Sequence, residues 1–218
     1  MKRLRVGVLA SGSGTNLQAL LDACAQEGAP AEIAVVISNV AAAYAAVRAR
    51  IARVPTELIE HPKFPDRGAF ERALAEALER HRVELVCLAG FMRLLGPAFL
   101  SRFPGRVLNM HPALLPSFPG LHAVRQALER GVKVAGCTVH FVDEGTDTGP
   151  IVAQAAVPVL AGDDEAALAA RILAEEHKLY PRVIRLFAEG RVRLEGRRVL
   201  VDAAPAQGPL SLENPGGA

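Results

Sequence analysis

The chain has 218 residues, half of them apolar, and a formal net charge of only +2. Its basic residues are scattered rather than bunched, which argues against a nucleic-acid partner and suits a small anionic substrate. No uncharged apolar run reaches about 18 residues, so we expect no membrane-spanning segment and no membrane partner. The length suits one sizeable core, and we expect a single domain over residues 1–202.

Sulfur and imidazole groups give no sign of a metal centre. Cys24, Cys87 and Cys137 lie far apart and form no Cys-x-x-Cys pair, so we expect neither a disulfide framework nor a zinc site. The six histidines show no His-x-x-x-His spacing. Residues 1–5 are basic but lead straight into a strand-like segment without a cleavage site, so we expect no signal peptide and a cytoplasmic protein.

The first 25 residues have the pattern of a buried strand, a glycine turn and a helix. The apolar run 5–10 ends in small residues and predicts a buried parallel strand. Thr15 and Gln18 have the spacing of a capping box, which predicts a helix beginning near Asn16. The apolar stripe of this helix consists of Leu17, Leu20, Leu21 and Cys24.

Strand and helix patterns then alternate along the chain. The predicted helices cover residues 41–51 and 66–82, and the predicted strands cover residues 32–37, 54–57, 84–89 and 106–111. This alternation predicts an α/β fold with a doubly wound, mostly parallel sheet. In such sheets ligands bind beyond the carboxyl ends of the strands, where the glycine turn lies.

The second half changes character. Strands predicted at 132–143 and 149–157 are joined by little more than the loop 144–148, which is too short for a helical crossover, so we expect an antiparallel pair. A long helix opens at Asp163 and Asp164 and ends at Gly190, and residues 191–201 predict a small hairpin. Residues 203–218 are rich in Ala, Pro and Gly and predict a flexible tail.

The glycine turn Ser11-Gly12-Ser13-Gly14-Thr15-Asn16 is a candidate anion site. Its backbone N–H groups and the helix that follows favour a negatively charged ligand. The turn lacks the third glycine of a dinucleotide fingerprint and the Gly-Lys-Ser/Thr ending of a triphosphate loop, so one phosphate monoester fits better than ATP. A tight strand-to-helix connection without any ligand is equally compatible with the turn.

Two further segments carry candidate catalytic groups. Asn109 and His111 are two residues apart on a predicted strand, so both side chains face the same way, one as an oxyanion donor and one as a proton donor or acceptor. His111 is also compatible with a structural role, bonding a buried carbonyl. The acidic connection 143–150 fits a solvated surface loop, or one whose Asp147 pairs with His111, orients it and raises its pKa.

These motifs together resemble one family. The segments SGSGTN at 11–16, AGFMR at 89–93, NMHPALLPSFPGLH at 109–122 and GCTVHFVDEGTDTGP at 136–150 are similar to phosphoribosylglycinamide formyltransferases, in that family's order. The resemblance covers about residues 5–190. It implies a Rossmann-like formyltransferase fold with an antiparallel strand pair in the C-terminal half.

The resemblance also implies roles for individual residues. Asn109 would polarise the formyl group and hold the oxyanion, His111 would donate a proton, and Asp147 would raise the pKa of His111 and relay protons through water. The implied substrate-binding residues are Gly14, Thr15 and Asn16 at the phosphate and Glu176 at the glycinamide part. The implied folate-binding residues are Arg67, Met92, Arg93, Leu94, Leu95, Asn109, Asp143 and Glu144. Thr146 stands where many relatives carry an aliphatic residue, and His140 is left out of the catalytic set.

The implied reaction moves a formyl group from 10-formyltetrahydrofolate to the amine of glycinamide ribonucleotide in purine synthesis, without metal or ATP. Two relatives of the same fold differ in sequence. Methionyl-tRNA formyltransferases continue the Leu-Leu-Pro motif with Arg-Gly-Ala and add a basic C-terminal domain, whereas here Ser117 follows that motif. Formyltetrahydrofolate deformylases carry an extra N-terminal domain. The implied partners are small molecules, and a homodimer is left open.

Overall fold

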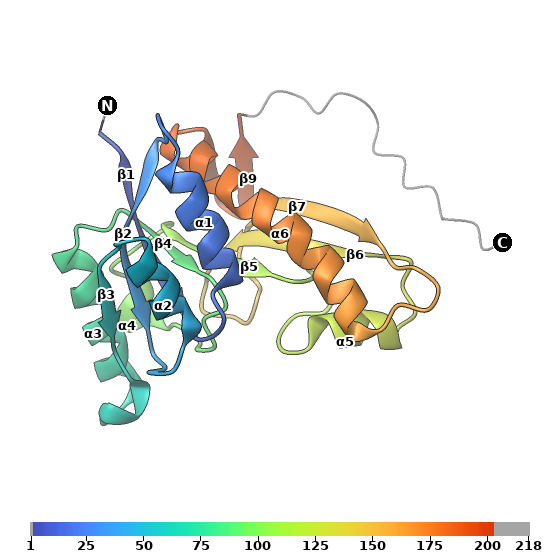
Figure 1. The fold of residues 1–218 in the computed structure, drawn as a ribbon, viewed down its shortest axis with the longest axis horizontal. Coiled ribbons are helices and arrows are strands. Elements are labelled where there is room, and N and C mark those ends of the chain that lie inside the picture. The colour runs from blue at the N-terminus through green and yellow to red at the C-terminus, as the bar shows by residue number, and fades with distance from the viewer. Residues whose placement is uncertain (1, 203–218) are drawn as a thin grey trace.

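The computed structural model describes residues 2–202, and a seven-stranded sheet runs through most of this part (Figure 1). The strands of the sheet are β1 (Leu4–Ala10), β2 (Ala31–Ser38), β3 (Thr56–Leu58), β4 (Leu85–Leu88), β5 (Val107–His111), β6 (Val134–Phe141) and β7 (Ile151–Pro158). A separate hairpin is formed by β8 (Val192–Glu195) and β9 (Arg198–Val201).

The sheet has the strand order β3-β2-β1-β4-β5-β6-β7. The first five strands in this order pair in parallel, whereas β6 is antiparallel to both β5 and β7. The predicted fold class is therefore confirmed, including the antiparallel β6–β7 pair. The antiparallel pairing of β5 with β6 was not predicted, and it brings the candidate catalytic strand beside β6.

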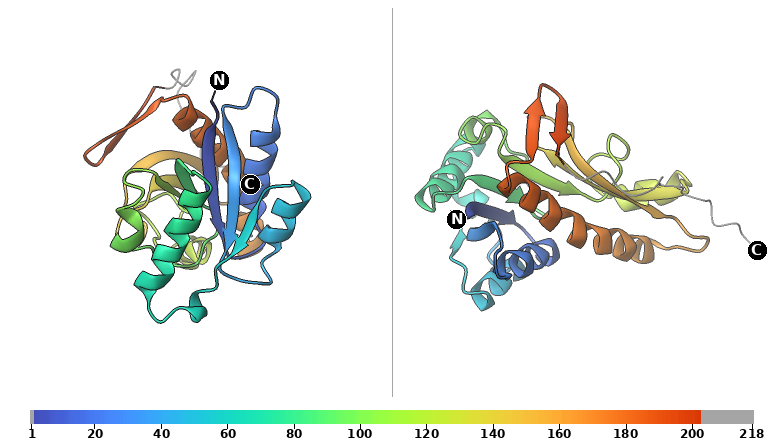
Figure 2. Two further views of the ribbon diagram at one scale, coloured as in Figure 1. Left: turned by 90° about the vertical axis from the view of Figure 1, so that its left-hand side faces the viewer. Right: turned by 90° about the horizontal axis from the view of Figure 1, so that it is seen from above.

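Helices cover both faces of the sheet (Figure 2). They are α1 (Thr15–Ala25), α2 (Tyr44–Ile51), α3 (Arg67–Arg80), α4 (Pro97–Leu100), α5 (Ala123–Glu129) and α6 (Glu165–Ala188), with a short 3-10 turn η1 (His61–Lys63). Buried side chains of α1, α2, α5 and α6 share one apolar cluster, and those of α3 and α4 share another with the opposite sheet face. Such burial on both faces explains why the parallel strands read as continuous apolar runs.

Most predicted elements are found, with differences at the helix starts. Helix α1 begins at Thr15, and its N-cap is Gly14 with φ of 70° and no side-chain cap. The predicted capping box is therefore wrong: the chain enters α1 through a left-handed glycine, and Gln18 bonds Asp22 instead. Helix α2 begins at Tyr44, three residues later than predicted. The short helices α4 and α5 were not predicted, because four and seven residues are too few for a periodic pattern.

Helix α6 follows the prediction closely. Asp164 accepts a hydrogen bond from the Ala167 N–H at 2.7 Å, and Gly190 lies just beyond the helix with φ of 69°. No helix in the described range is long and apolar enough to cross a membrane. The flexible tail predicted for residues 203–218 lies outside the described residues.

Candidate active site

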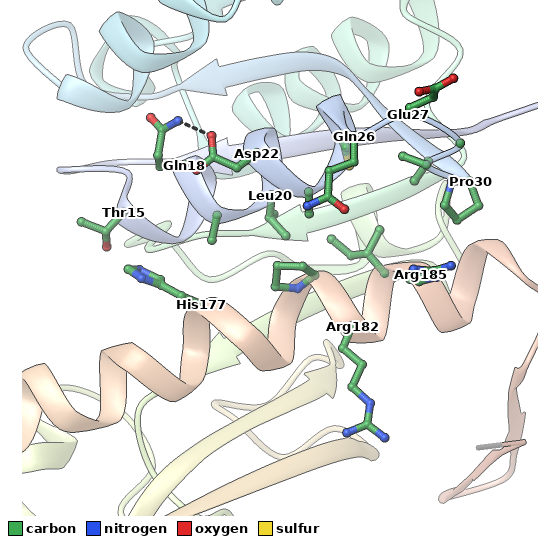
Figure 3. A pocket seen from close by; sticks show the side chains of 18 residues that line it. Thr15, Gln18, Leu20, Asp22, Gln26, Glu27, Pro30, His177, Arg182 and Arg185 are labelled. Carbon is green, nitrogen blue, oxygen red and sulfur yellow. Dashed lines mark hydrogen bonds between the residues drawn. The ribbon is translucent and has the colours of Figure 1, made fainter. Parts of the chain in front are cut away.

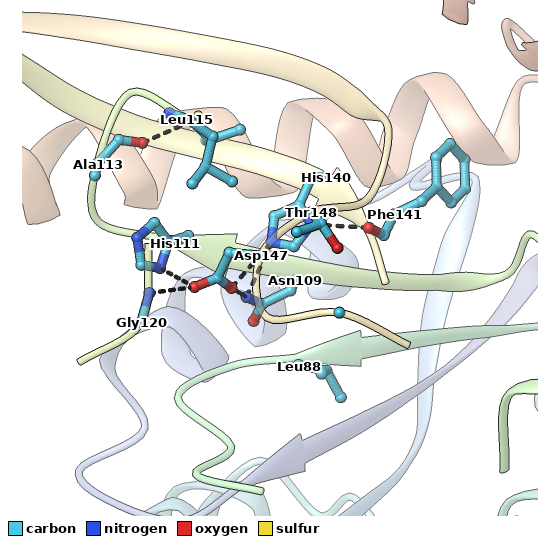
Figure 4. Close-up of polar contacts among 12 residues, drawn as sticks. Leu88, Asn109, His111, Ala113, Leu115, Gly120, His140, Phe141, Asp147 and Thr148 are labelled. Atoms are coloured by element: carbon cyan, nitrogen blue, oxygen red, sulfur yellow. Dashed lines mark hydrogen bonds and ion pairs between the residues drawn. The ribbon is translucent and has the colours of Figure 1, made fainter. Parts of the chain in front are cut away.

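The candidate catalytic residues meet at the carboxyl end of β5 (Figure 4). Asn109 and His111 lie on β5, and Asp147 lies in the loop between β6 and β7. The Asp147 carboxylate is 3.3 Å from His111 Nδ1, and Asn109 Nδ2 is 3.4 Å from Asp147 Oδ1. The fold therefore brings together three side chains that sequence alone did not place side by side.

His111 is buried and both of its ring nitrogens face oxygen atoms. Nδ1 faces Asp147, and Nε2 lies 2.8 Å from the Phe118 carbonyl oxygen, which can only accept a hydrogen bond. Phe118 itself has φ of 56°, a left-handed conformation that costs a non-glycine residue about 1 kcal/mol. Each ring nitrogen of His111 therefore has an oxygen acceptor within reach.

Asp147 is held from several sides. Its Oδ2 accepts the Gly120 backbone N–H at 2.8 Å, and its Oδ1 lies 3.6 Å from His140 Nε2. Burial by itself would raise the pKa of the Asp147 carboxyl, but hydrogen bonds from His140 and Gly120 and the nearby His111 outweigh it and lower that pKa. The carboxylate therefore stays ionised at neutral pH and places a negative charge beside His111.

His140 is a site residue that the sequence analysis left out. Its ring is only 2% exposed, Nδ1 donates to the Phe141 carbonyl oxygen at 2.8 Å, and Nε2 lies 3.2 Å from Asn109 Nδ2. With Nδ1 donating to Phe141, Nε2 either accepts from the Asn109 amide or, when it carries a proton, donates to Asp147, so these two contacts are alternatives. Asn109 and His140 are direct partners across the antiparallel β5–β6 ladder. Predicting this contact from sequence would have required knowing that β6 pairs antiparallel with β5.

A cavity of about 560 Å³ opens beside these residues. Of the predicted folate-binding residues, Met92, Arg93, Leu94, Leu95, Asn109 and Asp143 line it. Met92 and Leu94 are 65% and 58% exposed, so the cavity mouth has an apolar rim. Glu144 is exposed in the loop before Asp147 and is not among the lining residues that the described chain supplies.

Arg67, also predicted to bind folate, is not among the described residues that line the cavity. Its Nε is 2.6 Å from Oε1 of the buried Glu71, which also accepts the Gly96 N–H at 2.8 Å. A Cβ at Gly96 would lie 2.6 Å from Arg67 Nη2. Arg67 therefore packs directly against the residue that follows the lining segment 92–95.

The glycine turn forms the other part of the candidate site. Position 14 has room only for glycine, because a Cβ there would lie 2.8 Å from Cα and Cβ of Ala45 in α2. Thr15 and Asn16 occupy the first turn of α1, where backbone N–H groups lack helical acceptors. Nε of Arg48 donates to the Ser13 carbonyl oxygen at 2.8 Å, which adds a cation beside the turn.

Glu176 from α6 reaches this turn. Its Oε2 accepts a hydrogen bond from Asn16 Nδ2 at 2.7 Å, and the residue is only 5% exposed. Burial raises the pKa of the Glu176 carboxyl, and the Asn16 hydrogen bond opposes that rise only in part. Two predicted substrate-binding residues from opposite ends of the chain are thus in direct contact.

Ser11 links the glycine turn to the cavity wall. Its hydroxyl donates to Asn39 Oδ1 at 2.6 Å and accepts the Met92 N–H at 3.0 Å. Its backbone N–H bonds the Gly90 carbonyl oxygen at 3.1 Å. The ends of β1 and β4, and with them both halves of the candidate site, are therefore tied together.

A second groove, of about 670 Å³, runs between α1 and α6 (Figure 3). It begins at Thr15 and His177 and extends past Asp22 to Arg182 and Arg185. Burial and the nearby Arg48 charge lower the pKa of His177. None of the three candidate catalytic residues lines this groove. Across residues 2–202, no three His, Cys, Asp or Glu side chains gather in a way that would hold a metal ion.

Residues 4–184 match the family model described as formyl transferase. The chain therefore belongs to the formyl transferase family. This agrees with the mostly parallel sheet and its antiparallel strands β6 and β7.

Within this family the similarity is to phosphoribosylglycinamide formyltransferases, as the motifs indicated. The chain is 44% identical to the Escherichia coli protein of that name over 207 residues, 94% of this chain and 98% of that one. A solved structure of glycinamide ribonucleotide transformylase 1 from Symbiobacterium toebii shares 60% identity and superposes with a TM-score of 0.90, over 91% of this chain and 94% of that one.

Longer relatives contain the same region. The chain is 51% identical over 193 residues to the trifunctional purine biosynthetic protein adenosine-3 of Drosophila pseudoobscura pseudoobscura, a match that covers 88% of this chain. It spans only 14% of the length of that protein.

Proposed function

We propose that this chain transfers the formyl group of 10-formyltetrahydrofolate to the amine of glycinamide ribonucleotide, a step of purine synthesis. The observation that carries the proposal is the contact of Asp147 with both His111 and Asn109 beside a large cavity, in a chain of the formyl transferase family. A partly buried carboxylate, an imidazole and an amide donor are groups that suit acyl transfer to an amine.

The acceptor is proposed to bind at the glycine turn and Glu176. Backbone N–H groups of Gly14, Thr15 and Asn16 at the start of α1 suit its single phosphate, and the Arg48 guanidinium adds positive charge nearby. Glu176 accepts hydrogen bonds, which suits the amine and hydroxyl donors of the glycinamide part. One phosphate and one amine match the two kinds of group that this part of the site offers.

The donor is proposed to bind in the cavity of about 560 Å³, a volume within the usual range of small-molecule sites. Its rim of exposed Met92 and Leu94 suits a flat aromatic ring, and Asp143 in the wall offers a polar contact. Arg67 would act by supporting the segment 92–95 through its contact with Gly96, and Glu144 by its place in the loop before Asp147. When bound, the donor supplies an activated formyl group.

Asn109 and His111 are proposed to stabilise the negative charge that collects on the formyl oxygen as the amine attacks the formyl carbon. Asn109 Nδ2 has two N–H groups, and the one in the longer contact, 3.4 Å to Asp147, is proposed to donate to that oxygen instead. His111 must release one of its two contacts before it can donate there. Asp147 stabilises the imidazolium form of His111 throughout.

One proton must move from the attacking amine to the departing N10 atom as the new C–N bond forms and the old one breaks. The Asp147 carboxylate, kept ionised by its neighbours, is proposed to relay this proton through water. The step is proposed to need neither metal nor ATP. We also place the reaction in the cytoplasm, since Cys24, Cys87 and Cys137 are all free and buried.

The test is a competition assay with labelled 10-formyltetrahydrofolate, glycinamide ribonucleotide, methionyl-tRNA and water. We expect the label on formylglycinamide ribonucleotide, at a rate far above release of formate, and unchanged by chelators or by omission of nucleotide. Label recovered mainly as formate or formylmethionyl-tRNA would contradict the proposed acceptor and indicate a different activity. A strict requirement for a metal or for ATP would contradict the mechanism.

A further inference from the structure

The loop that carries Asp147 turns sharply and is open to solvent on its outer side. The Asp143 carboxylate accepts the Gly145 N–H at 3.1 Å and the Thr148 hydroxyl at 2.6 Å, which closes the loop on itself. Asp147 has φ of 54°, a left-handed conformation that side chains disfavour. Thr146 and Thr148 on either side of Asp147 are exposed. The loop therefore holds Asp147 in a left-handed backbone conformation, and its two neighbours are open to solvent.

The hairpin β8–β9 stands over this loop without packing tightly against it. A cavity of about 580 Å³ separates them, with residues 146–151 on one side and residues 197–200 on the other. Asp147 lines this cavity and also the cavity of about 560 Å³ that is proposed to bind the folate donor. The hairpin base is fixed to the body of the protein, because Val192, Val199 and Val201 pack against the main apolar cluster.

Arg197 bridges the gap. It lies in the turn of the hairpin, and its Nη2 donates to the Thr148 carbonyl oxygen at 2.7 Å, across 49 positions in sequence. A charged donor makes this hydrogen bond stronger than a neutral one. Since Thr148 directly follows Asp147 (Figure 4), fixing its carbonyl restrains the backbone that aims the Asp147 carboxylate at His111.

We infer that Arg197 is a positioning residue for the reaction: the C-terminal hairpin uses it to hold the Asp147 loop in its working conformation. This inference rests on the proposed function for the role of Asp147. Arg197 acts through the loop and not on the substrates, so its loss lowers kcat and leaves the KM of glycinamide ribonucleotide nearly unchanged.

The experiment compares Arg197→Ala, Arg197→Lys and Arg198→Ala with the unaltered chain. Arg198 is the matched control, because it lies in the same hairpin and lines the same cavity but, within residues 2–202, donates no hydrogen bond to the loop. We expect Arg197→Ala to lower kcat about three- to tenfold, the usual scale for one lost hydrogen bond that is exposed to solvent. Arg197→Lys keeps a cationic donor and restores part of the loss, and Arg198→Ala stays near the unaltered chain.

Hydrogen–deuterium exchange supplies a readout that needs no turnover. Arg197→Ala is expected to speed exchange in the peptide covering residues 143–149 and to leave the strands of the sheet unchanged. Unchanged exchange in that peptide, faster exchange throughout the protein, or faster loop exchange with normal kcat would each overturn the inference. If the unaltered chain fails to formylate glycinamide ribonucleotide, the proposed function fails, while the exchange comparison still decides whether Arg197 restrains the loop.

Discussion

Asn16 and Glu176, 160 positions apart, are joined by a 2.7 Å hydrogen bond between Asn16 Nδ2 and Glu176 Oε2. The bond links the first turn of α1 to the middle of α6 and closes the proposed acceptor site. It leaves Asn16 Oδ1 without a partner among the described residues, and it holds a carboxylate that is almost completely buried. Such an arrangement costs folding free energy and is expected where a ligand is bound.

Glu176→Gln should therefore stabilise the protein and impair its function. Burial raises the pKa of Glu176 in the folded state, so ionising this carboxyl costs free energy of unfolding. Below the unfolded-state pKa the carboxyl is protonated in both states and nothing is lost. The loss in stability grows as the pH rises through the folded-state pKa. Glutamine keeps an oxygen acceptor for Asn16 and carries no charge. We expect a gain in unfolding free energy at pH 8 that disappears near pH 4, measured by denaturant unfolding.

The same variant should bind glycinamide ribonucleotide about tenfold more weakly, which corresponds to roughly 1.4 kcal/mol for one charged hydrogen bond. Calorimetry measures this binding, with the folate ligand titrated separately as the control. A variant less stable than the unaltered chain at pH 8, or one with full substrate affinity, would contradict the assignment of Glu176.

The two glycines of the turn should respond differently to a side chain. Gly14 has φ of 70°, and a Cβ there would approach Ala45 to 2.8 Å, so Gly14→Ala should lose about 2 kcal/mol of stability. A Cβ on Gly12 meets nothing within 4 Å. Gly12→Ala should fold normally and weaken binding of the phosphate-bearing substrate only if that loop meets the phosphate.

Thermal unfolding and calorimetry on both variants separate these effects. Equal stability of Gly14→Ala and Gly12→Ala would mean that the contact with Ala45 is unimportant. Normal substrate binding by a folded Gly12→Ala protein, together with normal binding by a second variant at Ser13, would argue against a phosphate at this turn.

The sequence pattern predicted correctly that Asn109 and His111 lie on one strand. Their two-residue spacing on an apolar strand is enough to put them on one sheet face, because a strand has a fixed period of two. Asp147 was different, since a loop of five residues between strands fixes neither its φ of 54° nor its direction. The sequence therefore left two readings of Asp147 open, a solvated loop residue or a partner of His111.

The contact of His140 with Asn109 could not be predicted from the local sequence pattern. This contact depends on β6 lying antiparallel beside β5, and strand order is a property of the whole sheet. The start of α1 is a similar case. Thr15 and Gln18 match a capping sequence, yet the backbone of Gly14 makes the turn, because α2 packs within reach of its Cα. Tertiary packing decided both points.

His140→Ala should reduce turnover without changing the reacting groups themselves. The imidazole ring anchors Asn109 Nδ2 at 3.2 Å and lies 3.6 Å from Asp147, so its removal frees two of the three proposed catalytic side chains. We expect kcat to fall about ten- to a hundredfold. His140→Gln, which can still accept from Asn109, should recover part of the loss in the same steady-state assay. Identical rates for the two variants would indicate that the ring only fills space.

Asp147→Asn is the sharpest test of the proposed mechanism, because asparagine tolerates the left-handed backbone at this position better than most residues. The loop should therefore keep its course, with the Asn amide oxygen still able to accept from Gly120. The lost carboxylate charge leaves His111 without a counter-ion and removes the proposed proton relay. We expect kcat to fall at least a hundredfold, with circular dichroism unchanged.

Stability gives an independent check on the same variant. Neighbouring groups lower the pKa of Asp147, so its ionised form contributes stability above the unfolded-state pKa, and this contribution is lost as the pH falls through the folded-state pKa. Asp147→Asn should therefore be slightly less stable than the unaltered chain at pH 7, and the two should be equally stable at about pH 2. Glu129, which is exposed, supplies the charge control. We expect Glu129→Gln to change neither the rate nor the stability. Full activity in a folded Asp147→Asn protein would remove Asp147 from the mechanism, whereas a rate loss matched by a similar loss in Glu129→Gln would attribute the effect to net charge.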